Sequence, residues 1–117
     1  MRTVNFYKAA DRRSPVQDFL DALPPKAARK VLWVLQAVED LPRVPEQYFK
    51  KLVGTEDIWE VRADFAGGAF RLLGFWETGD LFIVTNAFAK KTQKNPPGEI
   101  QLAQARRSEY FNRKAKP

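Results

Sequence analysis

Residues 58–94 read IWEVRADFAGGAFRLLGFWETGDLFIVTNAFAKKTQK, and this stretch decides the fold. It contains three apolar runs, 58–64, 69–77 and 81–88, that are rich in aromatic and β-branched residues. Short turns that contain glycine separate the runs, a pattern that is typical of strands joined by hairpins. The stretch therefore predicts a meander of three antiparallel strands, in which alternate side chains point to opposite faces.

Charged side chains of this meander are expected to gather at one place. If Trp59 and Phe70 both face the core, the charged residues of the first two strands share the outer face. The length of the turn between these strands decides whether they do, because a shift of one residue reverses every side chain. The third strand then ends in two lysines. The residues expected to converge are Glu60, Arg62, Arg71, Lys90 and Lys91.

Two interpretations of this charged cluster compete. Charged residues on the outer face of a half-buried sheet are usually only solvated. Convergence of two arginines and two lysines from three strands is less common, because like charges repel one another unless a carboxylate or a ligand offsets them. The cluster therefore favours a cationic pocket with one carboxylate, built on a rigid sheet, over a merely solvated face.

Length and composition indicate one folded domain over residues 1–117, because 44% of the residues are hydrophobic and 13% are aromatic. The formal net charge is +6, from 20 Lys and Arg against 14 Asp and Glu. Residues 81–117 carry this excess, with eight basic and two acidic residues. A basic C-terminal third favours a polyanionic partner, which is either nucleic acid or an acidic protein segment.

Two residue types are absent from the sequence, and their absence narrows the chemistry. Without Cys there are no disulfides, thiol nucleophiles or thiolate metal sites, and without His there is no usual zinc site or Ser-His-Asp triad. We therefore expect no cofactor and no metal. The N-terminus lacks the apolar segment of a signal peptide, and no apolar run approaches the roughly 18 residues of a membrane span. A cytoplasmic location without a membrane partner is expected.

The flanking segments complete an α+β architecture. Residues 3–7 alternate as a first strand, and Ser14-Pro15 is typical of a helix N-terminus. A second helix is expected over about 26–41, and a last helix from about residue 99. The expected order is β-α-α-β-β-β-α. It gives an N-terminal strand, two helices packed on one face of a mainly antiparallel sheet, and a C-terminal helix.

One broad apolar face is expected on the second helix. It consists of Ala28, Val31, Leu32, Val34, Leu35, Val38 and Leu41. Trp33 breaks the pattern, since at about 100° per residue it points away from the centre of this face. Trp33 either packs on the first helix or a loop, or forms part of a protein-binding surface.

The order of motifs along the chain resembles a known family. The motifs are Trp59-Glu60-Val61-Arg62, Phe70-Arg71-Leu72 and Phe88-Ala89-Lys90-Lys91-Thr92-Gln93-Lys94-Asn95-Pro96, preceded by Ser14-Pro15-Val16 and Lys50-Lys51-Leu52. Together they resemble the RelE/HigB superfamily of type II toxins, in its phage-derived HigB-like branch. The resemblance covers nearly the whole chain and implies a RelE-like fold.

The resemblance implies a ribonuclease toxin. Such toxins enter the ribosomal A site and cleave the mRNA there without a metal ion. The ribose 2′-OH attacks the adjacent phosphate and leaves a cyclic phosphate and a 5′-OH. A cognate antitoxin, expected to be a helix-turn-helix DNA-binding protein, holds the toxin inactive. The charge pattern alone leaves open a non-catalytic RNA- or DNA-binding module and a module that binds an antitoxin-type partner.

The resemblance also implies roles for single residues. Arg71 matches a phosphate-binding arginine, Arg62 a second cationic strand position, and Lys91, beside Lys90, the basic residue after the last strand. Arginine suits this chemistry because its planar, bidentate donors match phosphoryl oxygens on which charge builds. Further RNA contacts are expected from Lys50, Lys51, Lys94, Arg106 and Arg107.

Proton transfer in this chain must use groups other than histidine. The candidates are Glu60, Glu46, a lysine or a tyrosine. Glu60 is favoured over Glu46, because a strand holds its side chain in place better than a Pro-rich loop does. Many RelE-like toxins carry Tyr or His just after the final strand. Residues 92–97 carry neither, and Tyr110 in the last helix is the candidate substitute.

Overall fold

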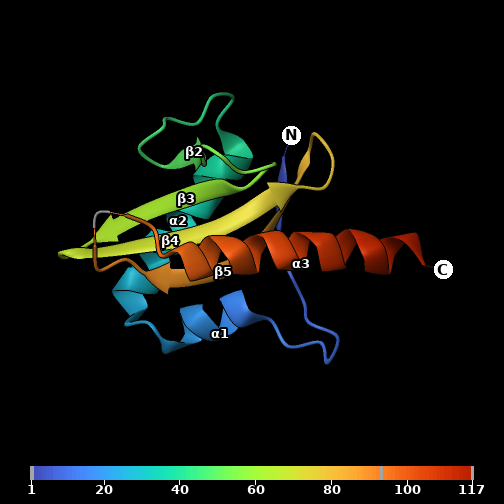
Figure 1. Ribbon diagram of the computed structural model, residues 1–117. Coiled ribbons are helices and arrows are strands. Elements are labelled where there is room, and N and C mark those ends of the chain that lie inside the picture. Colours follow the sequence, from blue (N-terminus) through green and yellow to red (C-terminus); the bar gives the residue numbers. More distant parts are fainter. Residues whose placement is uncertain (1, 93, 117) are drawn as a thin grey trace.

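A mixed β-sheet lies at the centre of the computed structural model, which describes residues 2–92 and 94–116 (Figure 1). Within these residues the sheet has five strands in the order β1-β5-β4-β3-β2. The strands are β1 (Thr3–Phe6), β2 (Phe49–Lys51), β3 (Trp59–Phe65), β4 (Gly68–Trp76) and β5 (Leu81–Ala89). The helices are α1 (Pro15–Ala22), α2 (Pro25–Asp40) and α3 (Pro97–Ala115). The predicted α+β architecture is confirmed.

The sheet extends the predicted meander on both sides. On one side β2 adds a short antiparallel strand, so β2 to β5 form a four-stranded meander. This strand was not predicted, because three residues are too few to show an alternating pattern. On the other side β1 lies beside β5 and runs parallel to it, with Thr3 opposite Leu81.

Helices cover both faces of the sheet. As predicted, α1 and α2 pack together on one face, where Val16 and Val31 join the apolar core. The last helix was predicted without a position relative to the sheet, and α3 packs on the opposite face over Leu73, Phe75 and Ile83. Figure 1 shows α3 lying along β4 and β5. The central strands carry apolar side chains on both faces, and such strands require cover on both sides.

The N-terminus of α1 forms as the sequence predicted. Oγ of Ser14 accepts a hydrogen bond from the backbone N–H of Gln17 at 3.2 Å. Pro15 follows in the first turn, where its missing N–H costs nothing. None of the helices in the described part of the chain has the length and apolar character needed to cross a membrane.

The buried face of α2 is narrower than predicted. It comprises Ala27, Val31, Val34, Leu35, Ala37 and Val38. Leu32 and Leu41, which were predicted to belong to it, are 49% and 38% exposed. Leu32 lies beyond one edge of this face, Leu41 follows the end of the helix as its C-cap, and Ala28, also predicted for the face, is only half-buried. Trp33 packs edge-on against Tyr48 of the following loop, with 5.6 Å between ring centroids, yet remains 53% exposed.

A two-residue turn joins β3 to β4 and sets the register of the site. Ala66 and Gly67 form this turn with φ angles of 51° and 81°, in the left-handed region that the tightest hairpin turns require. The register that follows places Arg62 directly opposite Arg71. Directly opposite residues share one face of a sheet. The charged residues of β3 and β4 therefore share one face of the sheet, as the predicted charge cluster requires.

A β-bulge interrupts the pairing of β4 with β5. The register shifts between Leu73 and Gly74, which leaves Thr85 of β5 as the extra residue. Glycine is required at position 74, because a Cβ there would lie 2.3 Å from the carbonyl oxygen of Ile83. The carbonyl of Thr85 accepts a hydrogen bond from Nη1 of Arg106 at 2.8 Å. The bulge thus anchors the middle of α3 to the sheet.

Candidate anion-binding site

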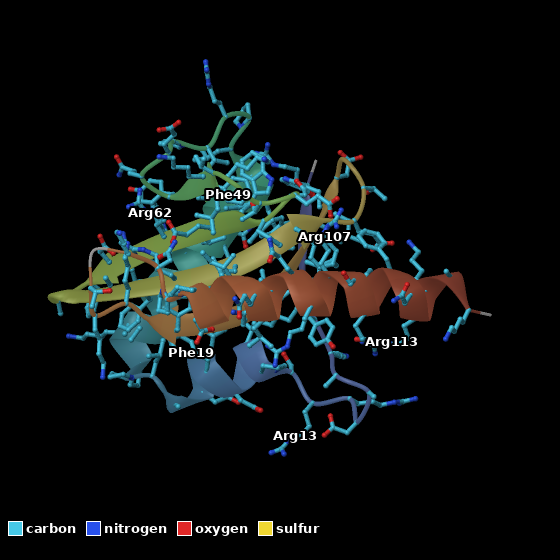
Figure 2. All side chains as sticks on the ribbon, viewed as in Figure 1. Arg13, Phe19, Phe49, Arg62, Arg107 and Arg113 are labelled. Atoms are coloured by element: carbon cyan, nitrogen blue, oxygen red, sulfur yellow. The ribbon has the colours of Figure 1, made fainter. Side chains whose placement is uncertain are left out.

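The four predicted cations line one pocket at the end of the meander. This pocket has a volume of about 460 Å³ and lies where β3 and β5 end and β4 begins. Its lining residues are Arg62, Ala69, Arg71, Lys90, Lys91 and Thr92. Figure 2 shows Arg62 at this end of the molecule, near the loop that joins β5 to α3. The convergence expected from the sequence is therefore present in the fold.

Glu60 lies among these cations but is buried, with 4% of the residue exposed. Its Oε1 lies 3.3 Å from Nε of Arg62, and its Oε2 lies 4.0 Å from Nε of Arg71. The carboxylate offsets the repulsion between the two arginines, which face each other directly across β3 and β4. Glu60 does not line the pocket. Its position suits holding the arginines in place.

Arg71 is the most deeply buried of the four cations. Its Nη1 donates hydrogen bonds to Oδ1 of Asp64 at 2.7 Å and to the carbonyl oxygen of Phe70 at 2.9 Å. Sequence reasoning did not single out Asp64, whose side chain is 71% exposed. Among the described residues, the Nε atoms of Arg62 and Arg71 are buried without a hydrogen-bond partner, and so is Oε2 of Glu60. Both Nε atoms lie beside the Glu60 carboxylate, which therefore holds the two guanidinium groups mainly by opposite charge.

The other lysines predicted to contact RNA do not line the pocket. Lys50 of β2 is exposed and lies opposite Glu60, which places it on the same face as the pocket. Lys51 follows it and points to the other face. Lys94 is exposed in the loop between β5 and α3. Gln93, in the same predicted motif, lies outside the described residues.

Arg106 and Arg107, also predicted to contact RNA, are engaged within the protein. Besides its bond to the bulge, Arg106 places its guanidinium 5.4 Å from the ring centroid of Tyr7. Nη1 of Arg107 lies 3.1 Å from Oε2 of Glu56. Figure 2 shows Arg107 well apart from Arg62. Both arginines lie outside the pocket, and their visible role is to hold α3 on the sheet.

The alternative proton-transfer groups are also outside the pocket. The hydroxyl of Tyr110 donates to Oε2 of Glu77 at 2.6 Å. Glu77 follows the last residue of β4, whereas Arg71 lies near its first residue, so Tyr110 lies toward the opposite end of this strand. This position does not support Tyr110 as a substitute for an aromatic residue after the final strand. Glu46 is exposed and does not line the pocket either.

A larger hollow, of about 810 Å³, lies between β1, the start of α1 and the end of α3. Its cations include Arg113 and Lys114, which pair with Glu109 and Glu77. Hydrogen bonds from Arg113 and then from Tyr7 lower the pKa of Glu109. Burial, followed by the hydrogen bond to Glu109, raises the pKa of Tyr7. Because two of the three cations that line it (Lys8, Arg113 and Lys114) are already paired, size alone does not make this hollow the better anion site.

The fold and the pocket define a small α+β protein that presents two arginines and two lysines at one end of an antiparallel meander. Over residues 2–92 and 94–116, no group of three or more metal-binding side chains is placed to hold an ion. The chain belongs to the family of phage-derived Gp49-like proteins (DUF891), whose model matches residues 18–108. This family is known as the HigB-like toxins of the RelE superfamily, so the resemblance seen in the motifs is confirmed. No curated protein matches the chain.

Proposed function

We propose that this chain is the toxin of a type II toxin–antitoxin pair and acts as a ribosome-dependent mRNA endoribonuclease. The observation that carries the proposal is the convergence of Arg62, Arg71, Lys90 and Lys91 on one pocket in a member of the HigB-like family. The pocket lies at one end of the molecule, at strand ends and loops that can approach a single-stranded message. Cleavage of the message in the ribosomal A site would stop translation.

The proposed reaction needs only groups on the RNA, cationic side chains and water. The 2′-oxygen of the ribose attacks the adjacent phosphorus and gives its proton to water, while the bond from phosphorus to the 5′-oxygen breaks. The products are a 2′,3′-cyclic phosphate and a 5′-hydroxyl. Negative charge builds on the phosphoryl oxygens in the transition state, and fixed guanidinium donors stabilise it there. Arg62 and Arg71 have this role in the proposal, and no metal ion takes part.

The burial of Glu60 favours Lys90 or Lys91 over Glu60 as the group that donates a proton to the leaving oxygen. Both Lys90 and Lys91 line the pocket, and the ammonium group of either one is a candidate donor of a proton to the leaving 5′-oxygen. Glu60 reaches the RNA only through Arg62 or Arg71, since its carboxylate is buried beside them. We therefore propose that Glu60 is a positioning residue, in place of the general base expected from the sequence.

The toxin family implies an antitoxin partner, and we propose that this partner is a helix-turn-helix protein that docks on the outer face of α2. A hollow of about 420 Å³ on this face is lined by Lys26, Arg29, Lys30, Trp33 and Phe65. Its two aromatic rings suit apolar side chains, and its three cations suit carboxylates. The alternative surface on α3 is less suitable, because Arg107 and Arg113 already pair with Glu56 and Glu109.

Substitution of Arg71 tests the proposed function. We expect induced expression of the unmodified chain to arrest growth, and Arg71→Ala to relieve the arrest. In a single-turnover assay on ribosomes loaded with mRNA, the loss of one fixed donor should lower the cleavage rate about 10²- to 10³-fold. Arg71→Lys should restore only part of the rate, because it keeps the charge but loses the bidentate geometry.

Matched controls make this test decisive. Arg43→Ala removes an exposed arginine from a loop outside the pocket and should leave the rate unchanged. Fragments should end in a cyclic phosphate and a 5′-hydroxyl. Full activity of a folded Arg71→Ala protein would contradict the role of Arg71. Ribosome or RNA binding without any cleavage would favour the alternative, a non-catalytic binding module.

A further inference from the structure

Two carboxylates lie next to Arg71, and they differ in exposure. The side chain of Glu60 is 5% exposed, whereas that of Asp64 is 71% exposed. Asp64 nevertheless makes the closer contact, at 2.7 Å from Arg71 against 4.0 Å for Glu60. We propose that Asp64 occupies the place on Arg71 that an RNA phosphate takes, and that its side chain leaves when RNA binds. This inference rests on the proposed function and makes Asp64 a built-in competitor of the RNA.

Asp64 is placed so that its side chain can leave without disturbing the sheet. Its backbone pairs with Ala69 in the register of β3 and β4, so only the side chain has to rotate. Ala69 lines the pocket, and its single methyl group leaves space above the strand. An ion pair with so exposed a partner contributes little to stability, because water solvates the released carboxylate well.

Arg71, in contrast, is held in place when Asp64 leaves. Its side chain is 6% exposed, and Nη1 also donates to the carbonyl oxygen of Phe70 at 2.9 Å. A buried guanidinium without any anionic partner would be costly, which accounts for a carboxylate close to it in the free protein. Carboxylate and phosphate oxygens accept from a guanidinium in the same geometry, so one can replace the other.

Glu60 and Asp64 should therefore affect RNA binding in opposite directions. Removal of the charge of Asp64 frees a donor of Arg71 and takes a negative charge away from the incoming phosphate. Removal of the charge of Glu60 leaves Arg62 and Arg71 facing each other across the strands without a buried counterion. The first change should strengthen binding, and the second should weaken it.

The test measures binding without cleavage. The probe is a fluorescent single-stranded oligonucleotide with 2′-O-methyl riboses, which cannot supply the attacking hydroxyl, and the readout is anisotropy at low salt. Asp64→Asn and Asp64→Ala should bind the probe roughly two- to tenfold more tightly than the unmodified chain, the range set by the weakness of an exposed ion pair. Glu60→Gln should bind it more weakly.

Two controls separate a local effect from a general change in charge. Asp80→Asn removes an exposed carboxylate at the β4–β5 turn and should change the affinity little, because this turn lies at the end of β4 opposite to Arg71. In an Arg71→Ala background, Asp64→Asn should give no gain. Unchanged or weaker binding by folded Asp64 variants, a gain that persists without Arg71, or no measurable binding by any variant would overturn the inference. Cleavage on ribosomes is measured separately, so a failure of the proposed nuclease is distinguishable.

Discussion

Arginines in this protein differ in role because their partners differ. Arg62 and Arg71 face each other across two strands beside the carboxylates of Glu60 and Asp64, and Lys90 and Lys91 give the pocket its net positive charge. Arg113 pairs with Glu109 of its own helix, and that carboxylate also accepts a hydrogen bond from Tyr7. Arginines of the first kind can bind an anion, whereas Arg113 stabilises the end of a helix.

The pairing of Glu109 predicts how stability depends on pH. Its pKa is lowered in the folded state, so its contribution is complete above the ordinary value of 4.5 and is lost as the pH falls through the folded value. In urea unfolding, Glu109→Gln should lower stability at pH 7 by at most about 1 kcal/mol, because the group is half-exposed. As the pH falls below 4.5, the stability of the variant should decrease less than that of the unmodified chain.

At alkaline pH, stability depends on pH in the opposite direction. Because the pKa of Tyr7 is raised above 10.0, its contribution is complete below that value and is lost as the pH rises through the folded pKa. Tyr7→Phe should therefore reduce the loss of stability in alkali. Glu46→Gln, at an exposed position, is the control for both limbs. Identical pH profiles for Glu109→Gln and the unmodified chain would show that the hydrogen-bonded pair is not formed in solution.

The sequence patterns predicted which cations form the site, but they did not predict how the neighbouring carboxylates pack against them. Alternation along the strands places Arg62 and Arg71 on one face, provided that the turn has the right length. The burial of Glu60 and the contact of Asp64 with Arg71 depend on side-chain packing between neighbouring strands. No spacing in the sequence reports such packing, so neither feature could be predicted.

α3 is a structural element more than an RNA-binding one. Arg106 in its middle bonds to the carbonyl of the bulge residue Thr85 and lies against Tyr7. Arg107 pairs with Glu56 in the segment before β3. A cationic helix that appears in the sequence to be an RNA-binding face is thus partly occupied by contacts to its own sheet.

Two substitutions distinguish the structural role of α3 from the RNA-binding role of the pocket. Arg106→Ala removes a charged donor from a partly buried carbonyl and should destabilise the fold by about 1–3 kcal/mol. Lys91→Ala, at an exposed pocket position, should change stability by no more than about 0.5 kcal/mol but weaken binding of the 2′-O-methyl probe. Chemical unfolding and anisotropy measure the two effects. A stable Arg106→Ala protein that fails to bind RNA would restore its predicted role in binding.

Local signals predicted the elements well, whereas their long-range arrangement was not predictable. Ser14 and the prolines place the starts of the helices, and the glycine-containing turns separate the strands. The parallel pairing of β1 with β5 joins segments far apart in the sequence, and no local pattern specifies it. The cover of the second face by α3 follows only once apolar residues are counted on both sides of β4 and β5.

The whole molecule has two basic surfaces on opposite sides of its sheet. The pocket of Arg62 and Arg71 lies on the face that α3 covers in part, and none of the described residues that line it is aromatic. The hollow on α2 contains Trp33 and Phe65 together with three cations. The first surface suits phosphates, whereas the second suits a protein segment with both apolar and acidic side chains. An antitoxin could therefore bind while the pocket itself remains uncovered.

This division predicts how a cognate antitoxin associates. Trp33→Ala should weaken the complex at least about tenfold at every salt concentration, because it removes an aromatic anchor. Reversal of Lys26, Arg29 and Lys30 to Glu should slow association, and this effect should shrink as salt screens the charges. Surface plasmon resonance at several salt concentrations measures both. Leu41→Ala, at an exposed apolar position just after α2, is the control. If neither change affects binding, the interface lies elsewhere.

The two-residue turn at Ala66 and Gly67 has a consequence for the evolution of this fold. One inserted residue in the hairpin, with the same two-residue turn kept, would shift the register of β4 against β3 by one residue. Arg71 would then point to the opposite face of the sheet, among the side chains that face α2. Descendants of such a protein can therefore accept many substitutions in the hairpin but very few insertions or deletions. We expect lineages that retain the activity to keep this hairpin constant in length. The loop before β2 is expected to vary in length, because the number of its residues does not set the pairing of Arg62 with Arg71.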